Sequence, residues 1–123
     1  MQTPAWQVSD WVQALASLQA VPFGFAFGHR GDLVVSEAGA STVSSYRLSS
    51  GGLDLVSASL PVGFGAACWV AISPDGKLAY TGNASGSISG FAIGAEGELT
   101  PLGTTPTASP RDLAFSRNGR YLY

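Results

Sequence analysis

The sequence predicts an all-β fold: a partial β-propeller of about two and a half four-stranded antiparallel blades. Three stretches resemble one another, FAFGHRGDLVV (25–35), VAISPDGKLAY (70–80) and LAFSRNGRYLY (113–123), and the alanine near the start of each recurs at spacings of 45 and 43 residues. Gly is abundant (16 residues) and only 11% of residues are charged, a composition that suits short strands joined by tight turns. Repeats of this length, each with several strands, are typical of propeller blades.

Residues 1–21 do not fit the repeat and are expected to form a short leader, either helical or irregular. Ser9 or Asp10 could cap a helix, because the apolar residues that follow fall near helical spacing. One interpretation is a segment foreign to the repeat fold. The other is a short helix that covers the open edge of the first blade.

The repeat fold is expected to occupy residues 22–123. Residues 22–61 are predicted to form blade one and residues 66–106 blade two. Residues 110–123 are predicted to form only the first two strands of a third blade.

Within blade two, strands are expected at about residues 69–72, 78–81, 87–93 and 99–103. Pro101 cannot donate a ladder hydrogen bond, so the last strand should lie at the edge of its sheet. The turn SPDGK between the first two strands needs a residue with positive φ, and Gly76 is placed to supply it.

Roughly four to eight blades are needed to close a propeller, so we expect this chain to be part of a larger ring. Unpaired strand edges at its ends would promote self-association. Assembly of several copies into one closed ring is the alternative explanation of the incomplete third repeat.

Composition excludes several classes of function. The formal charge is −2 and the six basic residues form no stripe, so nucleic-acid binding is not expected. The single cysteine, Cys68, excludes an internal disulfide, and no segment has metal-ligand or phosphate-loop spacing, so no metal and no cofactor are expected. The sequence has no apolar run of about 20 residues and no basic stretch before an apolar one, so neither a membrane span nor a secretory signal is predicted and a cytoplasmic location is favoured.

The segments PFGFAF, SEAG, AACWVAISPDG and SPRDLAFSRNGRYLY resemble the lactonase-type seven-bladed β-propeller family. That family includes propeller-type 6-phosphogluconolactonases and carboxymuconate cyclases, and it adjoins the YVTN repeat proteins. The resemblance covers residues 22–123. It implies seven blades, a small-molecule lactone or sugar-acid substrate, and a place in carbohydrate metabolism.

Propeller geometry sorts the polar residues onto two faces. The connectors into the first strand of each blade and the turns between second and third strands share one face, here called the connector face, which holds Glu37, Asn83 and Arg111. The opposite face holds the turns between first and second strands, including His29. The only histidine is therefore interpreted as a solvated turn residue, and Cys68-Trp69 as packing between blades.

The family resemblance implies roles for these residues. Arg111, in SPRD, resembles the arginine of the family's GPRH element, so it would bind a carboxylate or phosphate in the active-site cleft. Glu37, in VVSEA, resembles an acidic position that acts as acid or base, and Asn83 is a further substrate-binding candidate. Asp112 stands where the family has histidine, and Gly82 is taken as the blade-two counterpart of Glu37. A surface salt bridge or a loop cap is the alternative role for both Glu37 and Arg111.

The predicted function of the intact protein is hydrolysis or formation of a lactone, and the alternative is a non-catalytic propeller that binds a protein or a small ligand. The 123-residue chain alone is expected to be inactive, because a cleft shared among blades cannot be built from about two and a half of them.

Overall fold

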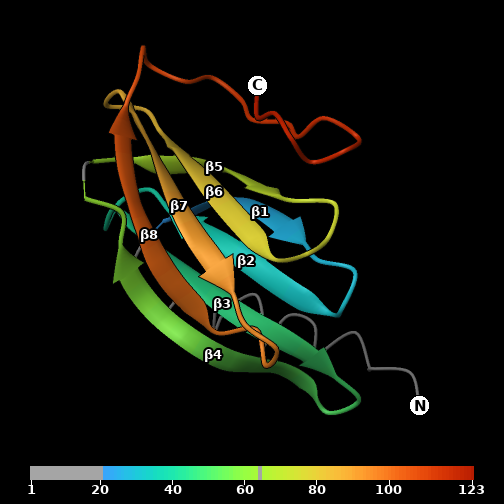
Figure 1. Ribbon diagram of the computed structural model, residues 1–123. Helices are drawn as coiled ribbons and strands as arrows, with labels where there is room; N and C mark the ends of the chain where they lie inside the picture. The colour runs from blue at the N-terminus through green and yellow to red at the C-terminus, as the bar shows by residue number, and fades with distance from the viewer. Residues whose placement is uncertain (1–20, 64) are drawn as a thin grey trace.

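The computed structural model describes residues 21–63 and 65–123, which form two four-stranded antiparallel sheets followed by a short hairpin (Figure 1). The predicted leader, apart from Val21, lies outside the described residues. No helix occurs in the described part of the chain, so the predicted all-β class and its antiparallel four-stranded blades are confirmed.

Blade one consists of β1 (Pro22–Phe27), β2 (Asp32–Glu37), β3 (Thr42–Ser49) and β4 (Gly52–Pro61), paired in that order. Each strand is antiparallel to the next, because every connection within the blade is a tight turn of two to four residues. β1 is the innermost strand, and the strongly curved β4 lies on the outside (Figure 1).

Blade two repeats this order with β5 (Ala67–Ile72), β6 (Leu78–Asn83), β7 (Ser87–Ile93) and β8 (Leu99–Pro106). Three of these strands extend two or three residues beyond the predicted bounds. β8 lies at the edge of the sheet, as Pro101 predicts, and almost all of it is exposed.

The C-terminal hairpin lies where the sequence predicts the first half of a third blade. Phe115 and Leu122 form an antiparallel bridge, and the amides of Ala114 and Tyr123 donate to each other's carbonyl oxygens at 2.9 and 2.8 Å. Gly119 supplies the positive φ of the turn, at 69°. The predicted two-stranded pairing is therefore present in this segment, with shorter strands than in the complete blades.

The turns between first and second strands lie at the right of Figure 1, and the connectors between blades lie at the left. This separation follows from the up-and-down order of the strands, and it agrees with the two faces expected from the sequence. Candidate site residues on the connectors and on the β2–β3 and β6–β7 turns therefore lie on one side of the molecule.

The two blades differ by one residue in the turn after the first strand. In blade one the turn closes with Gly28 N donating to Asp32 O (2.8 Å), and in blade two with Ser73 N donating to Leu78 O (2.9 Å). The second turn is thus one residue longer. Residues of β2 consequently match residues of β6 at an offset of 46, although the first strands match at 45.

This extra residue corrects one sequence-based assignment. Glu37 pairs with Pro22 at the start of β1, and Asn83 pairs with Ala67 at the start of β5. The counterpart of Glu37 in blade two is therefore Asn83, and the alignment that placed Gly82 there was wrong. An ungapped alignment of the two turns hides the insertion.

The hydrophobic core is shared between the two blades. Its buried members come from both sheets, with Val34 and Val43 in blade one and Ala79 and Phe91 in blade two. Figure 1 shows β1 and β5 side by side, so the inner strands of successive blades are also in contact. Cys68 is buried at this junction and its carbonyl accepts from the Ser36 hydroxyl (2.8 Å), in agreement with a packing role for this segment.

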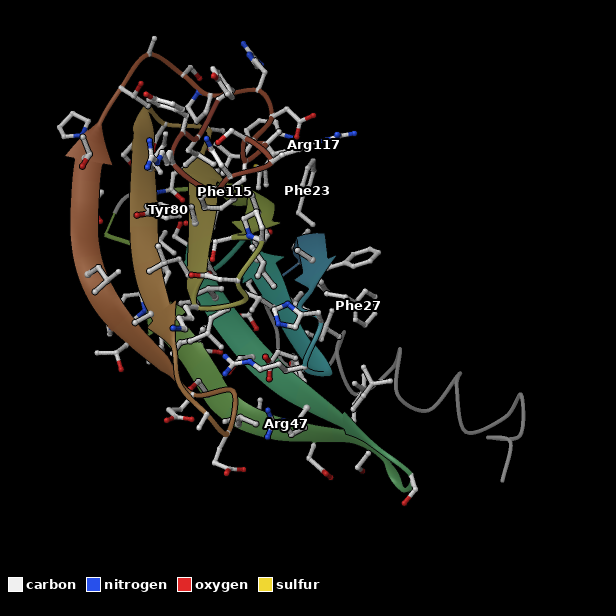
Figure 2. The ribbon with its side chains drawn as sticks, turned by 45° about the vertical axis from the view of Figure 1, so that its right-hand side comes forward. Phe23, Phe27, Arg47, Tyr80, Phe115 and Arg117 are labelled. Atoms are coloured by element: carbon white, nitrogen blue, oxygen red, sulfur yellow. The ribbon has the colours of Figure 1, made fainter. Side chains whose placement is uncertain are left out.

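An ion-pair cluster joins the blades on the opposite face. Arg47 donates to the buried Asp32 carboxylate and to Ala95 O, both at 3.0 Å, and lies 3.3 Å from Glu96. Arg30 lies 3.8 Å from the second Asp32 oxygen. Figure 2 shows Arg47 beside the strands of blade one, from which it reaches the β7–β8 turn of blade two.

Candidate functional site

The connector face is held together by serine hydroxyls that link the turns within a blade to the connectors between blades. Each of these hydrogen bonds joins a strand-connecting turn to a connector, at distances between 2.6 and 2.9 Å: Ser41 Oγ with Ala66 N, Ser85 Oγ with Gly65 O, and Ser109 Oγ with Ala84 O. The turns and connectors that could contact a ligand are thereby fixed relative to one another.

Both complete blades enter their first strand through a residue in the left-handed conformation. Val21 precedes β1 with φ 49° and Ala66 precedes β5 with φ 64°. Their carbonyl oxygens accept from Ala38 N (3.0 Å) and Ala84 N (2.9 Å), just after the second strand of each blade. This unfavourable backbone conformation recurs at the same position in both blades. We therefore interpret it as a regular feature of the chain where it enters the first strand of a blade.

Arg111 lies on the connector into the third unit, and its side chain is exposed. Two anchors flank it: Ser109, which donates to Ala84 O, and Leu113, which is buried against blade two. Asp112 accepts a hydrogen bond from Leu113 N (2.8 Å), so this carboxylate is bonded to the backbone amide of the next residue. An exposed guanidinium on a fixed connector can bind a carboxylate or phosphate through two parallel hydrogen bonds.

Glu37, at the end of β2, is buried, with only 2% of its surface exposed. Its carboxylate accepts hydrogen bonds from the hydroxyls of Thr42 and Ser44 on the neighbouring β3, the second at 2.7 Å. No ion pair involves Glu37 among the described residues. The surface salt bridge considered from the sequence is therefore absent from the described structure.

Asn83, at the end of β6, is fully buried. Its amide nitrogen donates to Ser87 Oγ and Ser89 Oγ, both at 2.9 Å, and its amide oxygen accepts from Thr81 Oγ1 (3.1 Å). All of these groups lie within blade two. Both amide N–H groups are therefore used by partners on the same sheet, and the amide oxygen accepts one of the two hydrogen bonds that it can accept.

Glu37 and Asn83 thus occupy one structural position in successive blades. Each bridges from the last residue of the second strand to two hydroxyls on the third strand, and those hydroxyl residues correspond between blades at an offset of 45. Sequence reasoning missed the hydroxyl partners. The alternation TVS (42–44) and SIS (87–89) was the available signal, since residues two apart on a strand share a face.

Tyr46 lies on the same face of blade one as Glu37, and its pKa is raised above the ordinary 10.0. Burial is the main cause, the negative charge of Glu37 adds to it, and a hydrogen bond with Ser44 acts in the opposite direction. The phenol is therefore neutral throughout the physiological pH range.

The three predicted site residues share the connector side of the fold but do not form one cluster. Glu37 and Asn83 have separate hydrogen-bond groups in separate blades, and neither bonds to Arg111. Within residues 21–63 and 65–123 no three acidic, His or Cys side chains are grouped as metal ligands, and no helix could span a membrane.

Comparison with known proteins relates the chain to lactonase-type β-propellers. The sequence model of the family "Lactonase, 7-bladed beta-propeller" matches residues 64–123. A proposed 6-phosphogluconolactonase from Bacteroides uniformis superposes with a TM-score of 0.75 and 26% identity over 84% of this chain and 32% of its own. The corresponding protein from Bacteroides fragilis gives a TM-score of 0.73 and 26% identity, covering 82% of this chain and 30% of its own.

A periplasmic gluconolactonase from Pseudomonas aeruginosa has the same fold, with a TM-score of 0.63 at 23% identity over 82% of this chain and 32% of its own. Among curated proteins no sequence matches the chain. The chain spans about a third of the length of the solved structures that it resembles.

Proposed function

Because residues 64–123 match the lactonase family of seven-bladed β-propellers, we propose that the intact protein hydrolyses or forms a lactone ring. The substrate class is a lactone or sugar acid that carries an anionic group, such as the phosphate of 6-phosphogluconolactone. The observation that carries this proposal is the exposed Arg111 on a hydrogen-bonded connector, within the segment that matches the family.

Arg111 is the proposed anion-binding residue. Its guanidinium would hold the phosphate or carboxylate and so orient the lactone ring toward the connector face. Arginine keeps its charge at all relevant pH values, so this interaction does not depend on a titration of the protein. Among the described residues Arg111 forms no ion pair with Asp112, and its side chain is exposed to solvent.

Glu37 is the proposed acid or base. Two hydroxyls fix its carboxylate, and a carboxylate offers about four lone-pair positions, so two remain for a water molecule or a substrate hydroxyl. Asn83 is an amide and cannot act as acid or base, and both of its N–H groups already donate to Ser87 and Ser89. We therefore propose a positioning role for Asn83 in place of direct substrate binding.

A non-catalytic binding function is the second candidate, and the burial of Glu37 favours it. If no water reaches the carboxylate, the connector face can still hold an anionic ligand through Arg111. Both candidate functions require binding of an anionic ligand, but only the enzyme would turn over a lactone. Measuring binding and turnover in the same set of variants therefore distinguishes them.

The test uses the intact protein that carries this chain, assayed for hydrolysis of 6-phosphogluconolactone and of the neutral gluconolactone. Arg111→Ala should raise KM for the phosphorylated lactone by about tenfold or more, the cost of one charged hydrogen-bonding partner, and leave the neutral lactone unchanged. Arg120→Ala, an exposed arginine of the hairpin turn, is the matched control. Binding without turnover supports the second candidate, and equal effects of the two variants exclude Arg111 as the anion site.

A further inference from the structure

The first strand of each complete blade has a β-bulge close to the connector face. The pairing of β1 with β2 shifts between Pro22 and Phe25, and the pairing of β5 with β6 shifts between Ala67 and Trp69. A bulge changes the direction of the side chains at that point of a strand, and bulges are common beside binding sites. Because β1 and β5 lie side by side (Figure 1), the side chains at the two bulges are neighbours.

Trp69 is the large side chain at the bulge of β5. Its ring contacts the ring of Phe23 on β1 edge to face, with the ring centroids 6.2 Å apart. On the side of the C-terminal hairpin the ring lies against Gly82, where an added Cβ atom would be 3.3 Å from Trp69 Cε3 and 3.4 Å from Leu113 Cγ. The units on both sides of Trp69 are therefore present in the structure, and its side chain is still partly exposed.

The indole of Trp69 and the connector that carries Arg111 are held together at Gly82. Leu113 lies against this glycine beside the indole, and Arg111 precedes Leu113 by two residues. Two residues of extended chain span at most about 7 Å. A sugar ring with a phosphate group is long enough to contact both an aromatic ring and a guanidinium that are placed in this way.

We propose that Trp69 binds the sugar ring of the substrate while Arg111 holds its anionic group. This inference rests on the proposed function, and it narrows the substrate class to cyclic sugar derivatives that carry a phosphate or carboxylate. The C–H groups on the face of a sugar ring pack on an aromatic ring, and the hydroxyls at the edge of the sugar stay free for hydrogen bonds. An apolar surface with a few polar groups beside it is the usual composition of a small-molecule site.

The test measures ligand affinity by titration calorimetry on the intact protein that carries this chain, so it does not depend on turnover. Glucose 6-phosphate supplies a sugar ring and a phosphate, whereas glycerol 3-phosphate supplies a phosphate without a ring. Trp69→Leu, which keeps an apolar side chain against Gly82, should weaken binding of glucose 6-phosphate about three- to tenfold and leave glycerol 3-phosphate unchanged. Trp69→Phe should restore most of the affinity.

Tyr80→Leu is the matched control. It removes another aromatic ring of blade two, one that contacts Phe115 of the hairpin at 5.8 Å (Figure 2), and it should bind both ligands normally. Equal weakening of both ligands in Trp69→Leu would overturn the proposal, as would an unmodified protein that does not bind glucose 6-phosphate.

A second measurement needs no variant, so it does not depend on the folding of Trp69→Leu. The ring current of the indole should move the C–H proton resonances of bound glucose 6-phosphate upfield, and unshifted resonances would contradict the proposal. If these effects are present but no lactone is turned over, the proposed enzyme activity fails and the sugar-phosphate site stands. If lactones are turned over but the effects are absent, only the role of Trp69 is excluded.

Discussion

At the scale of single residues, the position that ends the second strand of each blade couples a buried polar side chain to two hydroxyls. In blade one that side chain is a carboxylate, and in blade two it is an amide. In both blades the hydroxyls satisfy the hydrogen-bonding groups of this buried side chain. A buried polar group without a partner would lower the free energy of unfolding. The chemical difference between Glu37 and Asn83 decides which position can exchange protons.

Replacing Glu37 by alanine should lower the free energy of unfolding by about 1–3 kcal/mol, because the hydroxyls of Thr42 and Ser44 lose their acceptor. Urea unfolding followed by circular dichroism measures this value. Asp54→Ala, which removes an exposed carboxylate from β4 of the same blade, is the matched control and should change stability little. Equal stability of the two variants would show that the buried hydroxyls find other partners.

The turn of blade two contains a titrating group whose behaviour can be predicted. The Ser73 hydroxyl, and then the Lys77 amide, donate to the Asp75 carboxylate and lower its pKa below the ordinary 3.8. The stabilisation of the turn is therefore present above pH 3.8 and is lost as the pH falls through the lowered pKa. A carboxyl NMR titration should give a midpoint below 3.8, and Ser73→Ala should move it upward. An unchanged midpoint in that variant would contradict the assigned cause.

At the scale of strands and turns, the left-handed residue before each first strand is the clearest strained feature. Ala66 adopts φ 64°, a conformation that costs a residue with a Cβ atom roughly 1–2 kcal/mol. Ala66→Gly should therefore raise the urea midpoint. Ala67→Gly, one residue later and buried in β5, should lower it, since glycine weakens a strand. The prediction fails if both variants shift the midpoint in the same direction.

The ion-pair cluster on the opposite face joins elements of different blades, and its members should contribute unequally. Arg47→Met leaves the buried Asp32 without its closest cation and should destabilise the chain by about 3–5 kcal/mol. Glu96→Gln, at a side chain that is 84% exposed, should cost less than about 1 kcal/mol. Unfolding curves of the two variants give the comparison. Similar losses would mean that the Asp32 pair is as screened as a surface pair.

The sequence was sufficient to predict the strands, because tight turns with Gly76 and Gly119 divide it at regular spacings. It was insufficient to predict the counterpart of Glu37, since one inserted residue in a turn shifts a whole strand without disturbing its apolar pattern. The burial of Glu37 and Asn83 also escaped prediction. Their partners lie on the adjacent strand, and pairing register is set by the turn between strands.

At the scale of the whole molecule, the residues that hold the blades together and the residues proposed to bind a ligand lie in different parts of the fold. The sheet faces supply the core and the contacts between units, and the connector face carries the proposed ligand site. The exposed Arg111 belongs to that face, whereas Arg30 and Lys77 lie on the opposite one. An anionic sugar could therefore bind near basic residues on either face. We propose that it binds on the connector face, near Arg111.

The most direct measurement is an NMR titration of the chain with 6-phosphogluconate, with glucose as the neutral control. If the connector face binds the ligand, amide shift changes should centre on Arg111 and the β2–β3 and β6–β7 turns, and they should be absent with glucose and absent in Arg111→Ala. Shift changes centred instead on Arg30 and Lys77, or identical changes in Arg111→Ala, would contradict the assignment of ligand binding to the connector face.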